Sequence, residues 1–509
     1  MTRHLLPRGL RVGTRLACCV LPLLLGVGGC AYPVRNEALP IQDSRPTYDW
    51  AARAADKMPD TLVIVTASGG GTRATALALS VLRSMGEIRT ATGDTFADQV
   101  DIVSSVSGGS VAAAYFAMHG SAGLATLERD FVRKDGMGAL ALNGLNPVSL
   151  LALASPERER IDVLIDYLNR TLFDGATFDY FLQNRQPPYL ILNAADMVEG
   201  IPFPFTQYTM DLLCSDLRPM GIATAVAASA AFPVALSPVT LKNYSVPDTP
   251  HCAAVPYPQW LVKAQETKWD QNPSRVALGR TAATYAEGDK GYIHLLDGGI
   301  ADNLGIAEPY RLLTTTDVSP ALLTKLQNGE LKKIVFVVIN ARSFKPSDLD
   351  NAPNTPGVIS MLLASINSSI DRASFGAAER LRALFKESWA ADARKMEAAY
   401  REALVANNWT KAAILKSATE NMQRLAENAE FLTVELDAIP DPSCRRKMQS
   451  IPTSWTLTAG QIDATLAMGR ALFLDNANLP KVAAMLGANV TSSAANHTAD
   501  ACANLPEHW

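Results

Sequence analysis

Two apolar segments, each leading through a turn of small residues into a helical pattern, constrain the fold most. Residues 61–66 (TLVIVT) form a continuous apolar run rich in β-branched residues, and residues 100–103 (VDIV) form a second, shorter one. Such runs are typical of strands covered on both faces, as in a parallel sheet. Helical patterns follow at residues 74–85 and 110–118. The repeated order of strand, turn and helix predicts an α/β fold with a mainly parallel central sheet.

Further apolar runs predict the rest of the sheet. They occur at residues 189–193, 292–296, 334–339 and 431–436, and we expect each to form a central strand. Long helical patterns lie between them, including residues 381–425, where Ala, Glu, Lys and Arg recur at helical spacing.

The composition describes a globular chain, with 48% hydrophobic and 19% charged residues. A net charge of −4 provides no basic field for nucleic acid, so no nucleic-acid partner is expected. We expect no metal and no cofactor, because no zinc-type spacing of Cys and His and no Walker loop occur. Residues 136–156 carry no charge. They are expected to form a lid, a membrane-dipping surface or plain buried helices.

The first thirty residues are typical of an export signal that ends in a lipidation site. Four arginines and no acidic residue accompany an apolar stretch at residues 16–26, and the sequence Val27-Gly28-Gly29-Cys30 resembles a bacterial lipobox. Cleavage before Cys30 would make the lipidated cysteine the new N-terminus; cleavage at another small residue is the alternative. Ala31 favours the outer membrane of a bacterial cell envelope by resemblance to lipoprotein sorting. The lipid would anchor the chain to the membrane.

Four of the seven cysteines lie in the body of the expected exported chain. An even number in such a chain suggests disulfides. Three pairings are possible, and nearness in sequence favours Cys214–Cys252 and Cys444–Cys502. Four free buried thiols are the alternative.

Ser107 is the candidate nucleophile, because it lies at the centre of a turn of small residues after an apolar strand. A serine hydroxyl is a weak nucleophile that requires a sharp turn, a nearby base and donors for the developing oxyanion. Ser105 and Gly109 lie two residues to either side, as in a Gly-x-Ser-x-Gly elbow whose first glycine is a serine. Gly108 adds a further small residue, and the start of a helix there favours negative charge.

Asp297 is the candidate base. None of the six histidines is well placed for a triad, which leaves a carboxylate. Asp297 follows the apolar run 292–296 and precedes Gly298 and Gly299. The end of a strand is where ligands meet an open parallel sheet. The alternative is an aspartate that only caps its turn, a common role in an Asp-Gly pair.

A third motif, Gly69-Gly70-Gly71, connects the first strand to its helix. Glycines permit close approach of backbone N–H groups to an anion, as an oxyanion requires. A phosphate-binding loop is the alternative, although the loop lacks the Lys-Ser/Thr of a Walker motif. Arg73 is expected to fix the loop, to assist the anion site or simply to lie at the surface.

In this order, the three motifs resemble the patatin-like phospholipase family, whose pattern is a Gly-Gly-Gly-x-Arg loop, an elbow serine and an aspartate in Asp-Gly-Gly or Asp-Gly-Ala. Residues 227–233 (AASAAFP) and 297–303 (DGGIADN) resemble further segments of that family. The resemblance implies a three-layer α/β/α fold with helical insertions and a helical C-terminal part.

The resemblance also implies a function and an organisation. The function is hydrolysis of lipid acyl esters without a metal, of phospholipase A or lysophospholipase type, with Ser107 as nucleophile, Asp297 as base and the loop as oxyanion hole. The alternative is a catalytically silent envelope lipoprotein that binds lipid or a protein partner through the same pocket. The expected segments are a signal peptide (1–29), a tether (30–58), the hydrolase core (59–345), a helical part completing the same domain (346–480) and a tail (481–509).

Overall fold

The computed structural model describes the greater part of the chain. The described residues are 34–40, 46–50, 53–54, 59–136, 138, 159–184, 188–233, 235–245, 259–269, 273–287, 290–314, 324–325, 328–343, 355, 357, 360–361, 364–366, 368, 370, 377–488, 490 and 496–509. The expected signal peptide, Cys30, Cys252 and nearly all of segment 136–156 lie outside them. Within the described residues, no helix is both long and apolar enough to cross a membrane.

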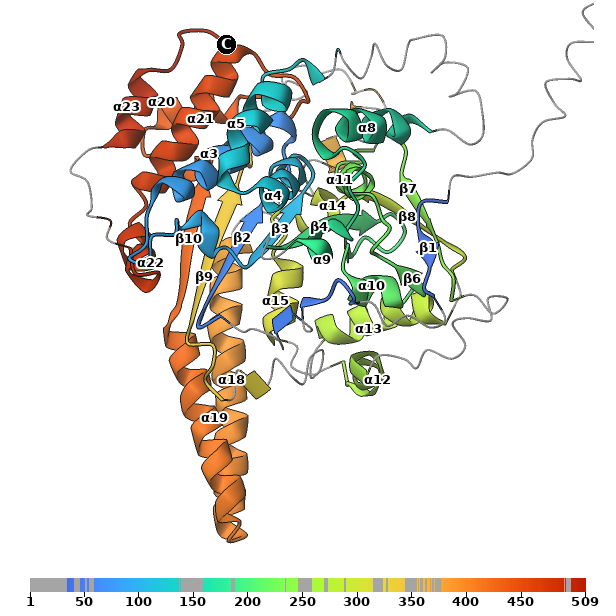
Figure 1. Ribbon diagram of the computed structural model, residues 1–509, viewed down its shortest axis with the longest axis vertical. Coiled ribbons are helices and arrows are strands. Elements are labelled where there is room, and N and C mark those ends of the chain that lie inside the picture. Colours follow the sequence, from blue (N-terminus) through green and yellow to red (C-terminus); the bar gives the residue numbers. More distant parts are fainter. Residues whose placement is uncertain are drawn as a thin grey trace, which may run out of the picture.

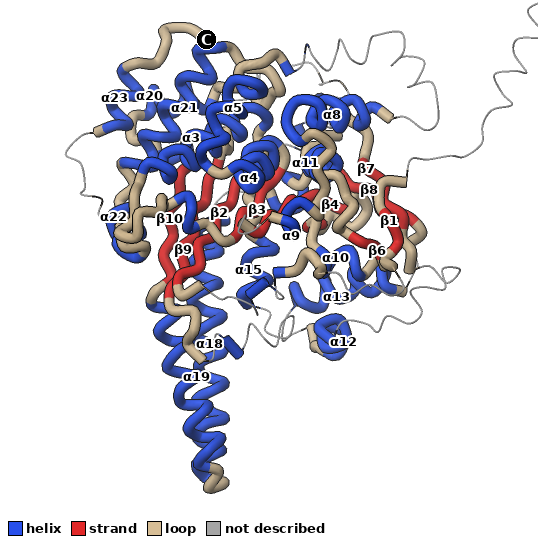
Figure 2. Tube along the Cα trace, in the orientation of Figure 1, coloured by secondary structure: helices blue, strands red, loops and turns tan. Residues whose placement is uncertain are grey.

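An eight-stranded mixed sheet forms the centre of the molecule (Figures 1 and 2). Its order is β10-β9-β2-β3-β4-β8-β7, and β5 pairs with β4 off this path. The first five strands in this order run parallel, whereas β8, β7 and β5 pair antiparallel with their neighbours. The bounds are β2 (Thr61–Ala67), β3 (Ile102–Val106), β4 (Tyr189–Asp196), β5 (Pro202–Pro204), β7 (Val239–Lys242), β8 (Tyr292–Asp297), β9 (Lys333–Asn340) and β10 (Ala429–Glu435). A separate two-stranded sheet pairs β1 (Glu37–Ala38) with β6 (Ser215–Asp216).

Helices cover both faces of the large sheet, which gives the expected three-layer α/β/α fold. Helices α3 and α4, which follow β2 and β3, pack against each other on one face, and α21 packs on α3. Figure 1 places α15 and α18 on the opposite side. The apolar residues of β2, β3 and β4 lie between these layers and are almost fully buried. The bounds are α3 (Gly71–Glu87), α4 (Gly108–His119), α11 (Ile222–Ser229), α14 (Gly299–Asp302), α15 (Ala307–Thr314), α20 (Pro442–Gln449), α21 (Ala459–Leu474), α22 (Leu479–Met485) and α23 (His497–Ala503).

The helical pattern at 381–425 forms two helices, α18 (Ala377–Val405) and α19 (Trp409–Glu427), which pack side by side as a long hairpin (Figure 1). The chain reverses at Asn407, which has a φ of 52°, and the side chain of Asn408 caps α19 by accepting the amide of Lys411. Because α19 leads directly into the start of β10, the hairpin projects from the edge of the sheet at which the parallel strands begin.

One expectation about the sheet is wrong, because β10 is an edge strand and not a central one. The strand β8 lies inside the sheet as expected, between β4 and β7, but it runs antiparallel to both and is only partly covered on one face. In β8 the buried Ile293 and Leu295 alternate with partly exposed residues, and Tyr292 is 46% exposed. A short apolar run fixes neither the direction of a strand nor its place in the sheet, because both depend on pairing with distant segments.

Candidate active site

Ser107 occupies a strained turn between β3 and α4. Its φ of 51° and ψ of −124° are rare for a residue with a side chain and cost roughly 1–3 kcal/mol. Two hydrogen bonds hold this conformation: the Ser107 amide donates to Ser229 Oγ at 2.8 Å, and its carbonyl accepts the amide of Ser110 at 2.9 Å. The turn therefore presents the Ser107 side chain at the edge where β2, β3 and β4 end, which we call the carboxyl edge.

Asp297 lies beside Ser107. The Ser107 hydroxyl donates to Asp297 Oδ2 at 2.7 Å, and the Gly299 amide donates to Asp297 Oδ1 at 2.8 Å. Asp297 is 5% exposed, and this burial raises the pKa of its carboxyl group to about 6, although both hydrogen bonds act to lower it. The side chain is therefore charged at neutral pH and more basic than an ordinary aspartate, as a general base requires.

Asp297 reaches the carboxyl edge by a different route from the one expected. Its strand, β8, runs antiparallel to β4 and pairs only with the last residues of that strand. Asp297 lies opposite Ala194, while Val106, next to Ser107, lies opposite Asn193 on the other side of β4. The two candidate residues are thus neighbours across the end of β4, although they come from strands of opposite direction.

Ser229 and Asn193 join the two halves of the site, and sequence reasoning missed both. Ser229, at the end of α11, accepts the Ser107 amide and donates its hydroxyl to the Asn193 carbonyl at 2.6 Å. The Asn193 side chain donates to Ser104 Oγ at 2.9 Å and to the carbonyl of Ser105 at 3.0 Å. The available signal was a polar residue inside an otherwise apolar helix or strand, since buried polar groups are usually hydrogen-bonded. Ser105 itself is fully buried in β3.

The glycine loop connects β2 to α3 and adopts conformations that favour glycine. Gly70 has a φ of 142° and Gly71 a φ of 60°. The Gly69 amide donates to the Asn303 carbonyl at 3.1 Å. The amides of Gly70 and Gly71 have no acceptor among the described residues. Of the three amides expected to donate to an oxyanion, that of Gly69 is therefore already bound to an acceptor within the protein, and those of Gly70 and Gly71 remain as candidate donors.

The loop and the elbow pack backbone against backbone. A Cβ atom on Gly108 would lie 2.0 Å from the Gly71 carbonyl oxygen, and one on Gly109 would lie 2.5 Å from the Ser68 carbonyl oxygen. The Thr75 hydroxyl adds a hydrogen bond of 2.7 Å to the Gly108 carbonyl. Glycine at these two elbow positions therefore permits the contact that places the loop against the nucleophile turn.

Arg73 is buried, with 2% of its surface exposed, so the surface alternative for this residue is wrong. Its Nε donates to the Ala341 carbonyl at 2.9 Å, after the end of β9, and its Nη2 donates to Thr453 Oγ1 at 3.0 Å. Its Nη1 donates to the carbonyl of Ile451. The guanidinium fixes the loop through segments that lie far from it in the sequence.

The glycines that follow Asp297 hold the base against β4. The Gly298 amide donates to the Ser229 carbonyl at 3.1 Å. A Cβ atom on Gly298 would lie 2.1 Å from the Asn193 carbonyl oxygen. Within the described part of the chain, no group of three or more His, Cys, Asp or Glu side chains is arranged to hold a metal ion.

Cysteines are paired at a distance from this site. Cys444 and Cys502 form a disulfide, and Cys214 is also disulfide-bonded. Because Cys252 lies outside the described residues, the pairing of Cys214 with Cys252 stays a prediction.

Comparison with known protein families finds a match for the part of the chain that holds the candidate site. Residues 65–310 match the model of the patatin-like phospholipase family, and this range includes the glycine loop, the Ser107 elbow and Asp297. We refer to these residues as the patatin-like domain. The family supports lipid hydrolysis as the general activity of the domain. None of the curated proteins matches the chain. Strands β9 and β10 and the helices α18 to α23 lie beyond the matched residues of the patatin-like domain.

Proposed function

We propose that this protein is a serine lipid acyl hydrolase, of phospholipase A or lysophospholipase type, that uses Ser107 as nucleophile and Asp297 as base. The observation that carries the proposal is the 2.7 Å hydrogen bond from the Ser107 hydroxyl to a buried carboxylate with a raised pKa. The strained backbone of Ser107 adds support, because strain of this kind concentrates at functional turns.

The first half of the reaction forms an acyl-enzyme. Asp297 Oδ2 takes the proton of the Ser107 hydroxyl while Ser107 Oγ attacks the ester carbonyl carbon, which gives a tetrahedral intermediate with a negative oxygen. The intermediate collapses as the bond to the leaving alcohol breaks. The proton held by Asp297 passes to that alcohol oxygen, so the lysophospholipid or glycerophosphodiester leaves with a free hydroxyl group and Asp297 is again charged.

The second half releases the fatty acid. Asp297 takes a proton from a water molecule, whose oxygen attacks the acyl carbon bound to Ser107 Oγ. The second tetrahedral intermediate collapses with return of the proton to Ser107 Oγ, and the free acid leaves. Asp297 acts as base in both halves, which suits a carboxylate with a pKa of about 6 better than one with an ordinary pKa.

The oxyanion of both intermediates is assigned to the backbone amides of Gly70 and Gly71. They have no acceptor among the described residues, and they lie at the start of α3, where the helix dipole favours negative charge. The Gly108 amide, which follows the nucleophile at the start of α4, is a third donor of the same kind. One well-placed donor contributes roughly 10²- to 10³-fold to the rate in hydrolases of this type.

Covalent labelling tests the proposal directly. The purified protein in detergent micelles is treated with a fluorophosphonate probe, and release of fatty acid from phospholipid micelles is measured in parallel. We expect Ser107→Ala to lose both labelling and hydrolysis, and Asp297→Ala to lose most of both. Ser84→Ala is the matched control, because this buried serine only donates to Ser80 within α3.

A folded wild-type protein that neither labels nor hydrolyses lipid in micelles would contradict the proposal. The remaining interpretation would then be a silent protein that binds lipid or a partner through the same pocket.

We also propose that Cys30 is lipidated and anchors the protein to the bacterial outer membrane. The support comes from the sequence of the first thirty-one residues alone. Labelling with radioactive palmitate in a bacterial host, followed by fractionation of the membranes, tests this proposal. Wild type should carry the label in the outer membrane fraction, and Cys30→Ala should carry none; equal labelling of both would contradict it.

A further inference from the structure

A segment near the C-terminus, Ile451–Ser454, lies against the glycine loop although it lies more than 100 residues beyond the patatin-like domain. The Ser454 carbonyl accepts the Thr72 amide at 2.8 Å. A Cβ atom on Gly71 would lie 2.5 Å from that same oxygen. Together with the bonds from Arg73 to Ile451 and Thr453, these contacts engage three consecutive residues of the loop.

These contacts determine where the loop can lie. The first amides of a helix have no acceptor within the helix, and Ser454 satisfies the amide of Thr72, the second residue of α3. The buried guanidinium of Arg73 also requires acceptors, since an unpaired buried charge is costly. Two of the three acceptors described above for Arg73 belong to Ile451–Ser454, and the third is Ala341.

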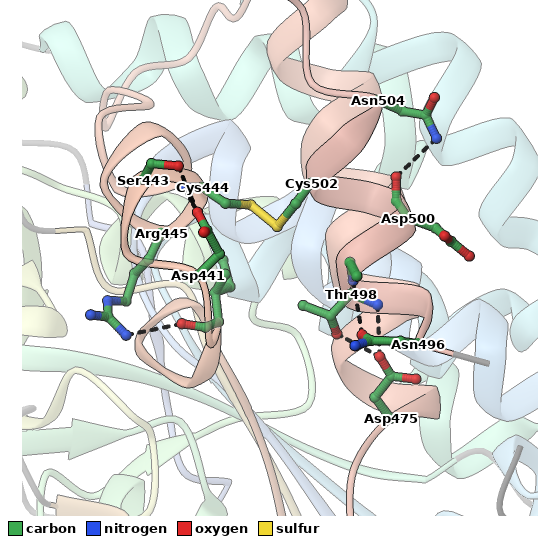
Figure 3. Close-up of a disulfide and its surroundings, with 12 residues drawn as sticks. Asp441, Ser443, Cys444, Arg445, Asp475, Asn496, Thr498, Asp500, Cys502 and Asn504 are labelled. Atoms are coloured by element: carbon green, nitrogen blue, oxygen red, sulfur yellow. Dashed lines mark hydrogen bonds between the residues drawn. A yellow bond between two sulfur atoms is a disulfide. The ribbon is translucent and has the colours of Figure 1, made fainter. Parts of the chain in front are cut away.

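The C-terminal tail is bound to residues that precede the segment Ile451–Ser454 in the chain. Figure 3 shows the disulfide that joins Cys444 in α20 to Cys502 in α23. Asp475 accepts the amide and hydroxyl of Thr498, both at 2.7 Å, at the start of α23. The Trp509 indole N–H donates to Ser450 Oγ at 3.0 Å, directly before Ile451. The tail is thereby fastened both to α20 and to the residue that precedes the segment.

We propose that Ile451–Ser454 is a positioning segment for the oxyanion loop and that the disulfide-closed tail holds it in place. We call this segment the C-terminal clamp. Thr453 is a positioning residue that acts through Arg73, and the clamp keeps the Gly70 and Gly71 amides directed at the reacting carbonyl. The effect on catalysis rests on the proposed function, whereas the effect on the loop does not.

Thr453→Val tests the clamp with little risk to folding, because Thr453 is exposed and valine keeps its shape. The variant removes the acceptor of Arg73 Nη2. We expect kcat on a phospholipid micelle to fall about three- to tenfold with KM within twofold, because a slightly displaced donor weakens the transition state more than substrate binding. Thr453→Ser, which keeps the hydroxyl, should lie within twofold of wild type.

The matched control is Thr456→Val. The hydroxyl of Thr456 donates to the exposed carboxylate of Asp135, and its loss should leave kcat unchanged. A double-mutant cycle with Arg73→Met tests whether Thr453 acts through Arg73. In the Arg73→Met background, Thr453→Val should have no further effect on kcat. An equal loss in both backgrounds would contradict action through Arg73.

Hydrogen exchange provides a readout that does not depend on activity. We expect the amides of residues 70–74 to exchange at least several-fold faster in Thr453→Val and in the double variant Cys444→Ala/Cys502→Ala than in wild type. Unchanged exchange in both variants would overturn the clamp. If wild type shows no fluorophosphonate labelling but exchange still rises, the proposed function fails and the clamp stands.

Discussion

The two candidate catalytic residues come from halves of the sheet that are built differently. Ser107 follows β3, a strand buried along its whole length between two parallel neighbours. Asp297 ends β8, an antiparallel strand whose side chains mostly alternate between buried and partly exposed. The nucleophile is placed by an unusual backbone conformation on a rigid strand. The base is placed by contacts with its neighbours, because one face of its own strand is only partly covered.

The seam between the halves is the end of β4. Asn193 and Ser229 contact both sides: they bind the Ser107 amide and the carbonyl of Ser105 on the parallel side, and the Gly298 amide on the antiparallel side. The distance between nucleophile and base therefore depends on this shared network. We therefore expect substitutions on the parallel side and on the antiparallel side to lower hydrolysis to different extents.

The largest effects are expected from adding a methyl group on either side of the seam. In Gly108→Ala the new atom would lie 2.0 Å from the Gly71 carbonyl oxygen, and in Gly298→Ala it would lie 2.1 Å from the Asn193 carbonyl oxygen. Backbone must move in both, at a cost of about 3 kcal/mol. We expect a loss of hydrolysis of about 10³-fold or more in Gly108→Ala, which separates loop from elbow, and about 10²-fold in Gly298→Ala, which displaces only the base.

Gly291→Ala is the matched control for these variants. Gly291 directly precedes β8, and a Cβ atom there would meet nothing within 4 Å. Its activity and its midpoint of urea denaturation should match those of wild type. If Gly298→Ala behaved like this control, placement of the base by close contact with β4 would be refuted.

A smaller effect is expected at the seam itself. Ser229→Ala leaves the Ser107 amide without its acceptor and the Asn193 carbonyl without its donor, which costs about 1–3 kcal/mol of stability. The displaced nucleophile should lower kcat roughly 10- to 100-fold, since small misplacements of reacting groups are costly.

Chemical denaturation and steady-state hydrolysis measure the two losses in Ser229→Ala. Ser84→Ala, a buried serine that bonds only within its own helix, serves as the control for lost serine hydroxyls in general. Equal activity of the two variants would mean that the halves are held together by some other contact.

The difference between the parallel and the antiparallel half of the sheet also separates what the sequence predicts from what it does not predict. Strands β2, β3, β4 and β9 were predicted within a few residues, because fully buried parallel strands leave continuous apolar runs. The direction of β8 and the edge position of β10 were not predicted, and β7 was missed, because the place of a half-covered strand depends on its partners. The partners of Arg73 lie 268 to 380 residues away in the chain, and no local pattern encodes them.

The smallest expected effect on the rate is its dependence on pH. The base must be charged to accept the Ser107 proton, and burial raises the pKa of Asp297 to about 6. We therefore expect kcat/KM to be level above pH 7 and to fall about tenfold per pH unit below pH 6. An exposed aspartate would show this fall near pH 4. A profile that stays level down to pH 5 would mean that Asp297 is not the base.

The raised pKa also has a consequence for stability, and Asp297→Ala isolates it. Between about pH 4 and pH 6 the folded wild type binds more protons at this position than the unfolded chain, so the contribution of Asp297 to stability is present at low pH and is lost as pH rises. The alanine variant has no carboxyl group and therefore lacks this pH-dependent loss of stability. The cavity that the substitution leaves also costs stability, but this cost does not change with pH. The free energy of unfolding of Asp297→Ala relative to wild type should therefore rise by roughly 1–3 kcal/mol between pH 4 and pH 7. A difference that stays constant with pH would show that the carboxylate is not desolvated, and the base on the antiparallel half would then be an ordinary surface acid.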